Sequence, residues 1–357
     1  DYYSGKYNYL NEKYKNILRL GLYQICFMDS VPNYASVNST VEIAKKNNYK
    51  FSKVVNAILM NFIRNDDNID IKDETYNYSK QFIKYLKNDY TLDDISKICK
   101  WNEKIPITWF RVIDKDISKL SDLNKDDFIV HQKVPYYVAF KDFKIAMNNY
   151  LKRKIIEVQS PASGLVVDML DIKRKEDVID ACAAPGGKSR YILELISDNQ
   201  KLYVNEKNIK KYNALKTDLN YDKVSIINQD ASKDTFKIAD KILVDVPCSS
   251  SGTIQKNPDI RWRKINLNLI SKLQLSIINN MSKYVNDSGA IVYSTCSIHN
   301  KENFQVIDKF LSINRGFKID NAANYIDKEF VDENGCLNIF SPKHNLEGMF
   351  AVRLIRK

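Results

Sequence analysis

The sequence predicts an α/β fold in which a small α+β module and an all-α N-terminal region precede a doubly wound, mostly parallel sheet. Three observations predict it. Strand and helix patterns alternate after residue 169, the pattern of a parallel sheet. Two strand-like runs stand between residues 101 and 168, and apolar residues recur at helical spacing before residue 66. The 357 residues suffice for two or three domains.

The first 66 residues are expected to form a helical domain. Apolar side chains recur at helical spacing in residues 18–27 and 54–62, and Ser39–Glu42 predicts a capped helix start. The polar run of residues 64–68 predicts a boundary. Residues 67–100 are then predicted to be a helical linker.

Strand patterns begin in the module of residues 101–168. Residues 105–112 and 134–140 are rich in aromatic and β-branched side chains, which favour strands. In the last domain, residues 169–357, the predicted strands are 178–181, 201–204, 224–227, 242–244, 291–294 and 349–354. The predicted helices there are 189–196, 207–219, 265–285 and 301–311.

Charge and cysteine usage restrict the classes of partner and compartment. A net charge of +11 favours a polyanionic partner such as nucleic acid, although A/T-rich coding would also enrich lysine. No apolar run is long enough for a membrane span, and no signal peptide is present, so no membrane partner is expected. The scattered cysteines show no zinc or disulfide spacing, which favours a reducing cytoplasm and no metal.

A loop of small residues follows the strand expected to end at Asp180. It comprises Cys182, Ala183, Ala184, Pro185, Gly186, Gly187 and Lys188. Small residues let backbone N–H groups at a helix N-terminus approach a ligand closely. The spacing is neither G-x-G-x-x-G nor a P-loop, so an adenosine-containing ligand with a carboxylate fits better than a pyrophosphate. A tight turn without a ligand is the plain structural alternative.

Two acids follow the next predicted strands. Glu206 stands about 20 residues beyond the loop, where a carboxylate can bind ribose hydroxyls. Asp230 follows the third strand and could accept a hydrogen bond from an adenine amino group. Asn205 beside Glu206 leaves the register open, and a solvated loop carboxylate is the alternative for each acid.

Two cysteines also come directly after predicted strands. Cys248 lies in Asp245–Ser249 and Cys296 in Ser294–Ser297, so both thiols are expected at one edge of the sheet. A thiolate that adds to carbon 6 of a pyrimidine activates carbon 5 toward a methyl donor. Asp245 is placed to bind ring nitrogen 3. A lone cysteine of this kind is usually a core residue, but the pair favours methyl transfer.

The run from about residue 151 to 357 resembles the RNA 5-methylcytosine methyltransferases of the NOL1/NOP2/Sun group. The resemblance rests on CAAPGGK at 182–188, DVPCSSSG at 245–252, NPDIRW at 257–262 and STCS at 294–297. It implies a Rossmann-like sheet that binds S-adenosyl-L-methionine, with Cys296 as nucleophile and Cys248 assisting product release. DNA cytosine-5 methyltransferases use the Pro-Cys cysteine instead, so the two roles stay open to exchange. Lys188 is expected to contact the substrate or to steady Asp245.

The helical N-terminal region is similar to the NusB-like domain of bacterial members that act on small-subunit ribosomal RNA. The likeness implies that the first helices of that domain are missing here, and that 16S ribosomal RNA is the substrate, with transfer RNA as an alternative. Before the catalytic domain the family's Val-Gln-Asp appears as Val158, Gln159 and Ser160, which puts in doubt any contact inferred for the missing acid.

A basic and aromatic cluster beside the Cys248 loop is expected to bind RNA. It comprises Lys256, Arg261, Trp262 and Arg263, and a solvated helix entrance with a packed tryptophan is its alternative. His131, His299 and His344 are expected at the surface or in loops. Two readings from other classes remain: a non-catalytic, RNA-binding ribosome assembly factor, and a nucleotide-dependent oxidoreductase. The chain is expected to act as a monomer.

Overall fold

The computed structural model describes residues 10–65, 74–124 and 126–357. The chain divides into two compact units, the first ending at Asp73 and the second running from Glu74 to Lys357. Each unit has a hydrophobic core of its own.

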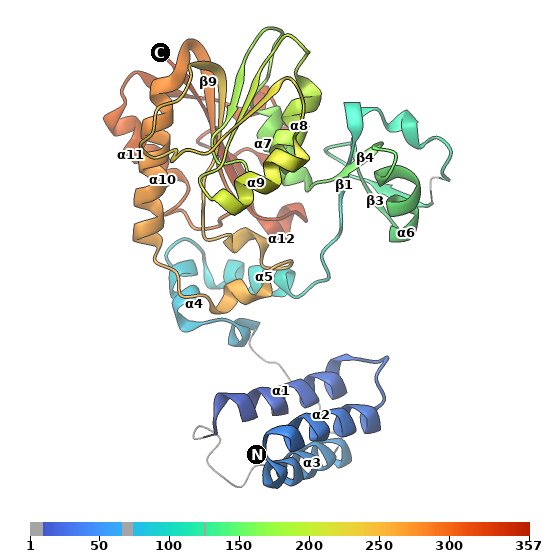
Figure 1. Cartoon of the computed structure of the whole chain (residues 1–357). Helices are drawn as coiled ribbons and strands as arrows, with labels where there is room; N and C mark the ends of the chain where they lie inside the picture. The colour runs from blue at the N-terminus through green and yellow to red at the C-terminus, as the bar shows by residue number, and fades with distance from the viewer. Residues whose placement is uncertain (1–9, 66–73, 125) are drawn as a thin grey trace. The chain divides into compact units, whose positions relative to one another are not determined.

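Within residues 10–65, the first unit contains three packed helices, α1 (Glu12–Phe27), α2 (Asn33–Asn47) and α3 (Tyr49–Arg64) (Figure 1). The predicted helix start at Ser39 is wrong, because α2 begins directly after Pro32. The Ser39 and Thr40 hydroxyls both donate to the Ser36 carbonyl, so these side chains are satisfied inside the helix instead of capping it.

The second unit begins with the helical turn η2 (Glu74–Asn77) and the helices α4 (Lys80–Leu86) and α5 (Leu92–Asn102). Ser79 and Thr91 cap α4 and α5 by accepting from backbone N–H groups. The apolar side of both helices packs against three buried residues of the last domain, Ile254, Ile260 and Ile298. These helices are therefore part of the core of the second unit.

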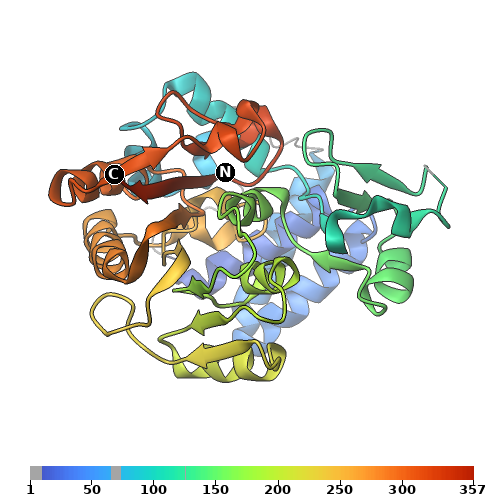
Figure 2. The same ribbon diagram turned by 90° about the horizontal axis from the view of Figure 1, so that it is seen from above.

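The small module has a four-stranded antiparallel sheet in the order β2-β3-β1-β4. Its elements are β1 (Phe110–Val112), β2 (Phe128–Val130), β3 (Tyr137–Phe140), α6 (Phe143–Ile145), the π-helical η5 (Ala146–Leu151) and β4 (Ile156–Val158). The predicted strand at 105–112 shortens to β1, because Pro106 has no N–H for a ladder and Ile105 is exposed. Both views show the module at the side of the large sheet (Figures 1 and 2).

The large sheet has the order β10-β12-β9-β8-β5-β6-β7, with β11 paired to β12. The strands are β5 (Val178–Asp180), β6 (Leu202–Asn205), β7 (Val224–Ile227), β8 (Ala239–Asp245), β9 (Val285–Thr295), β10 (Phe317–Asp320), β11 (Leu337–Ile339) and β12 (Met349–Arg356). Strands β5 to β9 run parallel, and β12 is antiparallel to β9, β10 and β11. The predicted fold class is confirmed.

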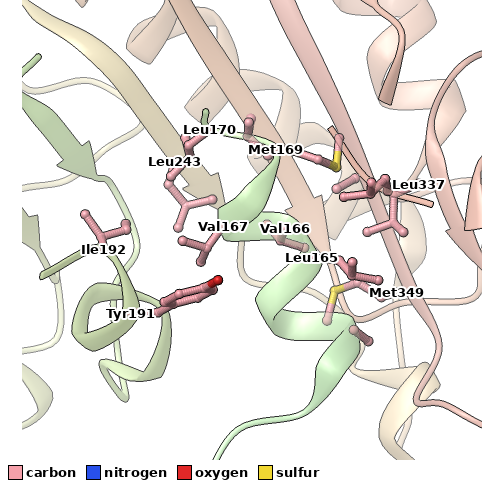
Figure 3. Packing of buried hydrophobic residues seen from close by; sticks show 14 of the residues in the cluster. Leu165, Val166, Val167, Met169, Leu170, Tyr191, Ile192, Leu243, Leu337 and Met349 are labelled. Atoms are coloured by element: carbon pink, nitrogen blue, oxygen red, sulfur yellow. The ribbon is translucent and has the colours of Figure 1, made fainter. Parts of the chain in front are cut away.

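Helices cover both faces of this sheet (Figure 1). One face carries α7 (Pro161–Asp168), α8 (Gly187–Leu195) and α9 (Ile209–Asp218), and the other carries α10 (Leu267–Met281) and α11 (Phe304–Ile313). The short η6 (Ser251–Thr253), η7 (Pro258–Trp262) and α12 (Ser341–His344) lie in connections. In Figure 3, side chains of α7 point toward the sheet between those of α8 and β12. This buried helix joins the small module to the sheet.

Candidate active site

The residues of interest meet because five parallel strands end at one edge of the large sheet. Their last residues are Asp180, Asn205, Ile227, Asp245 and Thr295. The loop 182–188 and the two cysteine loops all start at this edge, where open α/β sheets bind ligands.

The two cysteines are in contact. The Sγ atoms of Cys248 and Cys296 lie 3.3 Å apart, and both side chains are partly exposed. The Gly252 N–H donates to the Cys296 carbonyl at 2.9 Å, which ties the two loops together. A Cβ on Gly252 would lie 2.2 Å from the Gly348 carbonyl oxygen, so the last position of DVPCSSSG has room only for glycine.

The surroundings make these thiols unequal. A hydrogen bond from Cys248 lowers the pKa of Cys296, burial opposes this, and the Lys188 ammonium lowers it further. For Cys248, the hydrogen bond to Cys296 and burial both raise the pKa. Cys296 is therefore the thiol that ionises first, with Cys248 as its hydrogen-bond donor.

Asp245 is held between Lys188 and a serine. Its Oδ2 accepts from Lys188 Nζ at 2.6 Å, and its Oδ1 accepts from the Ser294 hydroxyl at 2.7 Å. Burial would lower the pKa of Lys188, but Asp245 outweighs burial and the pKa is raised. The ammonium and the carboxylate thus form one ion pair beside the thiols.

Asp180 was not among the predicted site residues, although it ends an apolar strand at the loop. It is buried, and its Oδ2 accepts from the Ser189 hydroxyl at 2.6 Å. Its Oδ1 is buried without a hydrogen-bond partner among the described residues. Burial raises the pKa of Asp180 to about 7. A buried carboxyl oxygen without a partner can accept a hydrogen bond from a ligand. In the sequence, the signal for Asp180 was its position as the acid directly after the apolar residues Val178 and Ile179.

The small-residue loop has room for a ligand. Gly186 has φ +99°, a conformation that glycine adopts without strain, and it caps α8. A Cβ on Gly187 would meet no atom within 4 Å, so space is open beside the loop. The Gly187 carbonyl is held by Gln159 Nε2 at 2.9 Å. Open space, the first N–H groups of α8 and the unpartnered Asp180 oxygen fit an adenosine ligand that carries an amino acid.

Glu206 after β6 and Asp230 after β7 differ in the contacts that their carboxylates already make within the protein. Asn205 is buried and donates to the Ala181 and Gln229 carbonyls, so its neighbour Glu206 is the residue that faces outward. Glu206 is half-buried, and its Oε1 accepts from the Asn208 N–H. Asp230 accepts from Lys207 Nζ at 2.8 Å, and this hydrogen bond lowers its pKa to about 2. Asp230 is therefore a charged acceptor at neutral pH.

The predicted RNA-binding cluster is divided by its contacts. Trp262 is 61% exposed, and the exposed Arg263 pairs with Asp259. Lys256 pairs with Glu347. The Arg261 side chain is only 11% exposed, pairs with Glu103 at 2.7 Å and donates to the Asn102 carbonyl. Arg261 thus fastens the end of α5 to η7. Trp262 is the aromatic residue of the cluster, and its exposed indole can stack on a base.

His299 lies in the loop after β9, which agrees with the expectation of a surface or loop residue, but it is not at the surface. His131 and His344 are partly buried, and each accepts from a backbone N–H. His299 is fully buried, and its ring packs edge-on against Phe82 and Tyr85 of α4. The docking of α4 covers this residue, and nothing in its local sequence signals that contact.

Neither a membrane-spanning helix nor a metal cluster is found in the described part of the chain. None of its helices combines the length and the apolar character needed to cross a bilayer. Within the same residues no three His, Cys, Asp or Glu side chains come close enough together to hold a metal ion.

Two family models match the sequence. Residues 167–355 match the 16S rRNA methyltransferase RsmB/F model, and residues 2–64 match the NusB family model. The second match includes residues outside the described part of the chain.

Curated relatives and solved structures agree with these matches. The probable ribosomal RNA small subunit methyltransferase B of Bacillus subtilis is 30% identical, over 85% of this chain and 73% of that protein. The enzyme of that name from Shewanella oneidensis is 28% identical, over 95% of this chain and 82% of its own length. The structure of NSun6 from Pyrococcus horikoshii with SFG superposes with a TM-score of 0.66 at 18% identity, covering 78% of this chain and 98% of that one. This last likeness shows the fold.

Proposed function

Because the chain belongs to the 16S rRNA methyltransferase RsmB/F family, we propose that it methylates carbon 5 of a cytosine in small-subunit ribosomal RNA through a covalent cysteine intermediate. Members of this family are S-adenosylmethionine-dependent RNA cytosine-5 methyltransferases, and so is this chain. The observation that carries the finer proposal is the pair of thiols 3.3 Å apart beside the Lys188–Asp245 ion pair.

S-adenosylmethionine supplies the methyl group when it is bound. Four parts of the chain would hold it: the backbone of Cys182–Lys188, the Asp180 carboxyl, Glu206 for the ribose, and Asp230 for the adenine. The open space beside Gly187 supports this assignment.

Cys296 is the proposed nucleophile. Its thiolate adds to carbon 6 of the cytosine, and the new C–S bond leaves carbon 5 electron-rich enough to accept the methyl group. The proton on carbon 5 then passes to a base, for which the Cys248 thiolate is the proposed acceptor. The C–S bond breaks, and its electron pair returns to Cys296 as a thiolate. The pKa of Cys296 is lowered by the hydrogen bond from Cys248, which supports this role. Cys248 is proposed to assist the elimination.

The Lys188–Asp245 pair is proposed to bind the polar edge of the cytosine. Addition of a thiolate places negative charge on the ring, and a proton held at ring nitrogen 3 offsets that charge. Asp245 is paired with the Lys188 ammonium, so a proton is already present next to the carboxylate. Lys188 therefore has the double task of steadying Asp245 and carrying this proton.

The substrate cytosine must leave any base stack to reach these thiols, since carbon 6 is not accessible within a paired helix. Trp262 is proposed to stack on a base near the site, and Lys256 and Arg263 to contact phosphates. Arg261 has no part in this role, because its side chain is largely buried and held by Glu103 and the Asn102 carbonyl, whereas Lys256 and Arg263 are exposed. The NusB-like first unit is proposed to position the RNA.

The test is a methylation assay with a radiolabelled methyl donor and two RNA substrates. A small-subunit ribosomal RNA transcript should incorporate label at one cytosine, located by bisulfite sequencing, and a transfer RNA transcript should not. Label in transfer RNA alone would overturn the ribosomal assignment. Binding of S-adenosylmethionine without methylation of any RNA would favour a non-catalytic assembly factor.

A further inference from the structure

A fully buried carboxylate lies directly behind both catalytic loops. Glu302 is 0% exposed and stands just before α11, six residues after Cys296 in the sequence. Its Oε1 accepts from the Ser249 backbone N–H at 2.8 Å and from Gln274 Nε2 at 3.0 Å. Its Oε2 accepts from the hydroxyls of Ser249 and Ser297, both at 2.5 Å. No ion pair joins Glu302 to a cation among the described residues.

These contacts join the two cysteines through their neighbours. Ser249 follows Cys248, and Ser297 follows Cys296, so one carboxylate binds the residue next to each thiol. The Ser251 hydroxyl lies 3.1 Å from both serine hydroxyls and accepts from the Ile298 N–H. The loops after β8 and β9 are thus fixed against each other by one anion.

The charge of Glu302 raises the pKa of the Cys248 thiol but is not among the main influences on the pKa of Cys296. A buried anion without a cation is costly unless donors surround it, and here four donors do so. The hydrogen bond to Cys296 and burial raise the pKa of Cys248, and the Glu302 charge adds to this rise. Among the main influences on Cys296 are Asp245, Ser250 and Lys188.

We propose that Glu302 is a positioning residue that locks the Cys248 loop to the Cys296 loop and makes the two thiols chemically unequal, so that Cys296 is the one that attacks. The assignment of chemical roles rests on the proposed function. The locking of the loops and the inequality of the thiols are properties of the folded protein.

The informative variant is Glu302→Gln. The serine hydroxyls can turn to accept from the new amide N–H groups, while the carbonyl oxygen keeps the Ser249 and Gln274 donors, so the fold should persist without the charge. Alkylation by iodoacetamide, followed for each cysteine peptide by mass spectrometry across a pH series, measures the reactivity of both thiols. The wild type should react mainly at Cys296. In the variant this preference should fall several-fold, because the buried charge that disfavours the Cys248 thiolate is removed.

Turnover gives the second readout. Glu302→Gln should lower kcat by roughly 10- to 100-fold, the effect of a small misplacement of reacting groups, while KM for RNA stays within about twofold. Glu302→Asp, which keeps the charge, should restore part of the thiol preference. Asp308→Asn removes an exposed charge from α11, the helix that follows Glu302, and should match the wild type in both readouts.

A Glu302→Gln protein with wild-type thiol preference and wild-type kcat would overturn the proposal. Equal losses in Glu302→Gln and Glu302→Asp, with the thiol preference unchanged, would reduce Glu302 to a packing residue and also overturn it. If Glu302→Gln does not fold, the double variant Ser249→Ala and Ser297→Ala takes its place. It removes both hydroxyl contacts but keeps the charge, so kcat should fall while the thiol preference persists, and a wild-type kcat would overturn the locking of the loops. The alkylation needs no RNA. If the wild type methylates no RNA, the proposed function is wrong, but the alkylation measurement still decides whether Glu302 makes the two thiols unequal.

Discussion

Two chemically identical side chains acquire different properties at this site because their neighbours differ. The hydrogen bond between the two thiols favours the thiolate of Cys296, and the Lys188 ammonium favours it further. For Cys248, the hydrogen bond to Cys296 and partial burial raise the pKa, which keeps its proton in place in the free enzyme. The sequence alone left the two roles open to exchange. The contacts that separate them come from Lys188, 108 positions before Cys296, and from Cys248 in the other loop.

The exposed indole of Trp262 leads to a prediction about RNA affinity. Trp262→Ala should weaken binding of a single-stranded RNA oligonucleotide roughly 10- to 100-fold, because one base–aromatic stack is worth about 1–3 kcal/mol. Fluorescence anisotropy at fixed salt measures the change. Tyr221→Ala is the matched control, since Tyr221 is also exposed but precedes β7, at the opposite edge of the sheet. Equal losses in both variants would refute a specific stacking role.

The buried His299 leads to a prediction about acid sensitivity. Burial lowers its pKa to about 4, whereas the unfolded chain has about 6.5. Between these values the unfolded state binds more protons, so stability is complete above pH 6.5 and falls as the pH decreases toward 4. At pH 5 the loss is about 2 kcal/mol. In urea unfolding, His299→Leu should therefore lose less stability than the wild type between pH 7.5 and 5. In the control His131→Leu, the loss of stability between pH 7.5 and 5 should stay closer to the wild-type loss, because the His131 ring is less buried. A His299→Leu protein with the wild-type pH dependence would contradict the prediction.

At the level of elements, the sequence predicted those with a long or repeated pattern. The parallel strands β5 to β9 and the helices α8 to α11 all fall on predicted segments, because buried strands and amphipathic helices carry strong apolar periodicity. The short strands β2, β4, β10 and β11 were not predicted. Because the parallel strands were predicted correctly, the location of the candidate site at their carboxyl ends could be predicted as well. The supporting residues Asp180, Gln159 and Glu302 were not predicted, because their roles arise only from tertiary contacts.

Gln159 links the small module to the ligand loop. Its Oε1 accepts from Arg111 Nε and from the Tyr137 hydroxyl, both at 2.7 Å, and its Nε2 donates to the Gly187 carbonyl. Arg111 is fully buried and forms a bidentate pair with Glu194 of α8. The module is thereby joined to the helix and to the loop proposed to hold S-adenosylmethionine.

Gln159→Leu should lower both stability and ligand affinity. The variant leaves buried partners unsatisfied, at a cost of about 1–3 kcal/mol, and it frees the Gly187 carbonyl. Thermal unfolding and calorimetric binding of S-adenosylmethionine measure the two effects, and affinity should fall several-fold. Gln200→Leu is the control, since Gln200 is equally buried but lies before β6, away from the site. It should lose stability without losing affinity. Undiminished ligand binding in Gln159→Leu would show that the link has no bearing on the loop.

At the scale of the whole molecule, the catalytic machinery belongs to a unit that is larger than the match to the methyltransferase family model. The helices α4 and α5 supply Phe82, Leu86 and Ile95 to a core that also holds Ile254 and Ile260. The Tyr90 hydroxyl donates to the Ile298 carbonyl, two residues after Cys296, and the Asn300 N–H donates to Asp89. These helices therefore support the same loops that carry the cysteines.

Truncation separates the contributions of the two units. A protein of residues 74–357 should fold and bind S-adenosylmethionine as the full chain does, because it retains its own core. Its affinity for small-subunit ribosomal RNA should fall by roughly tenfold or more, since two linked binding modules reinforce each other. A protein of residues 104–357 should unfold at a lower temperature, because the core formed with α4 and α5 is opened. Equal melting temperatures for the two truncated proteins would contradict this account.

The most direct measurement is whether a covalent RNA–protein adduct survives on a denaturing gel. We expect Cys248→Ala to accumulate a retarded band when it is incubated with substrate RNA and S-adenosylmethionine, because the base stays attached to Cys296. Cys296→Ala should form no such band and no methylated RNA, while S-adenosylmethionine still binds. An adduct in Cys296→Ala and none in Cys248→Ala would exchange the roles, and the absence of any adduct in both variants would contradict covalent catalysis by this pair.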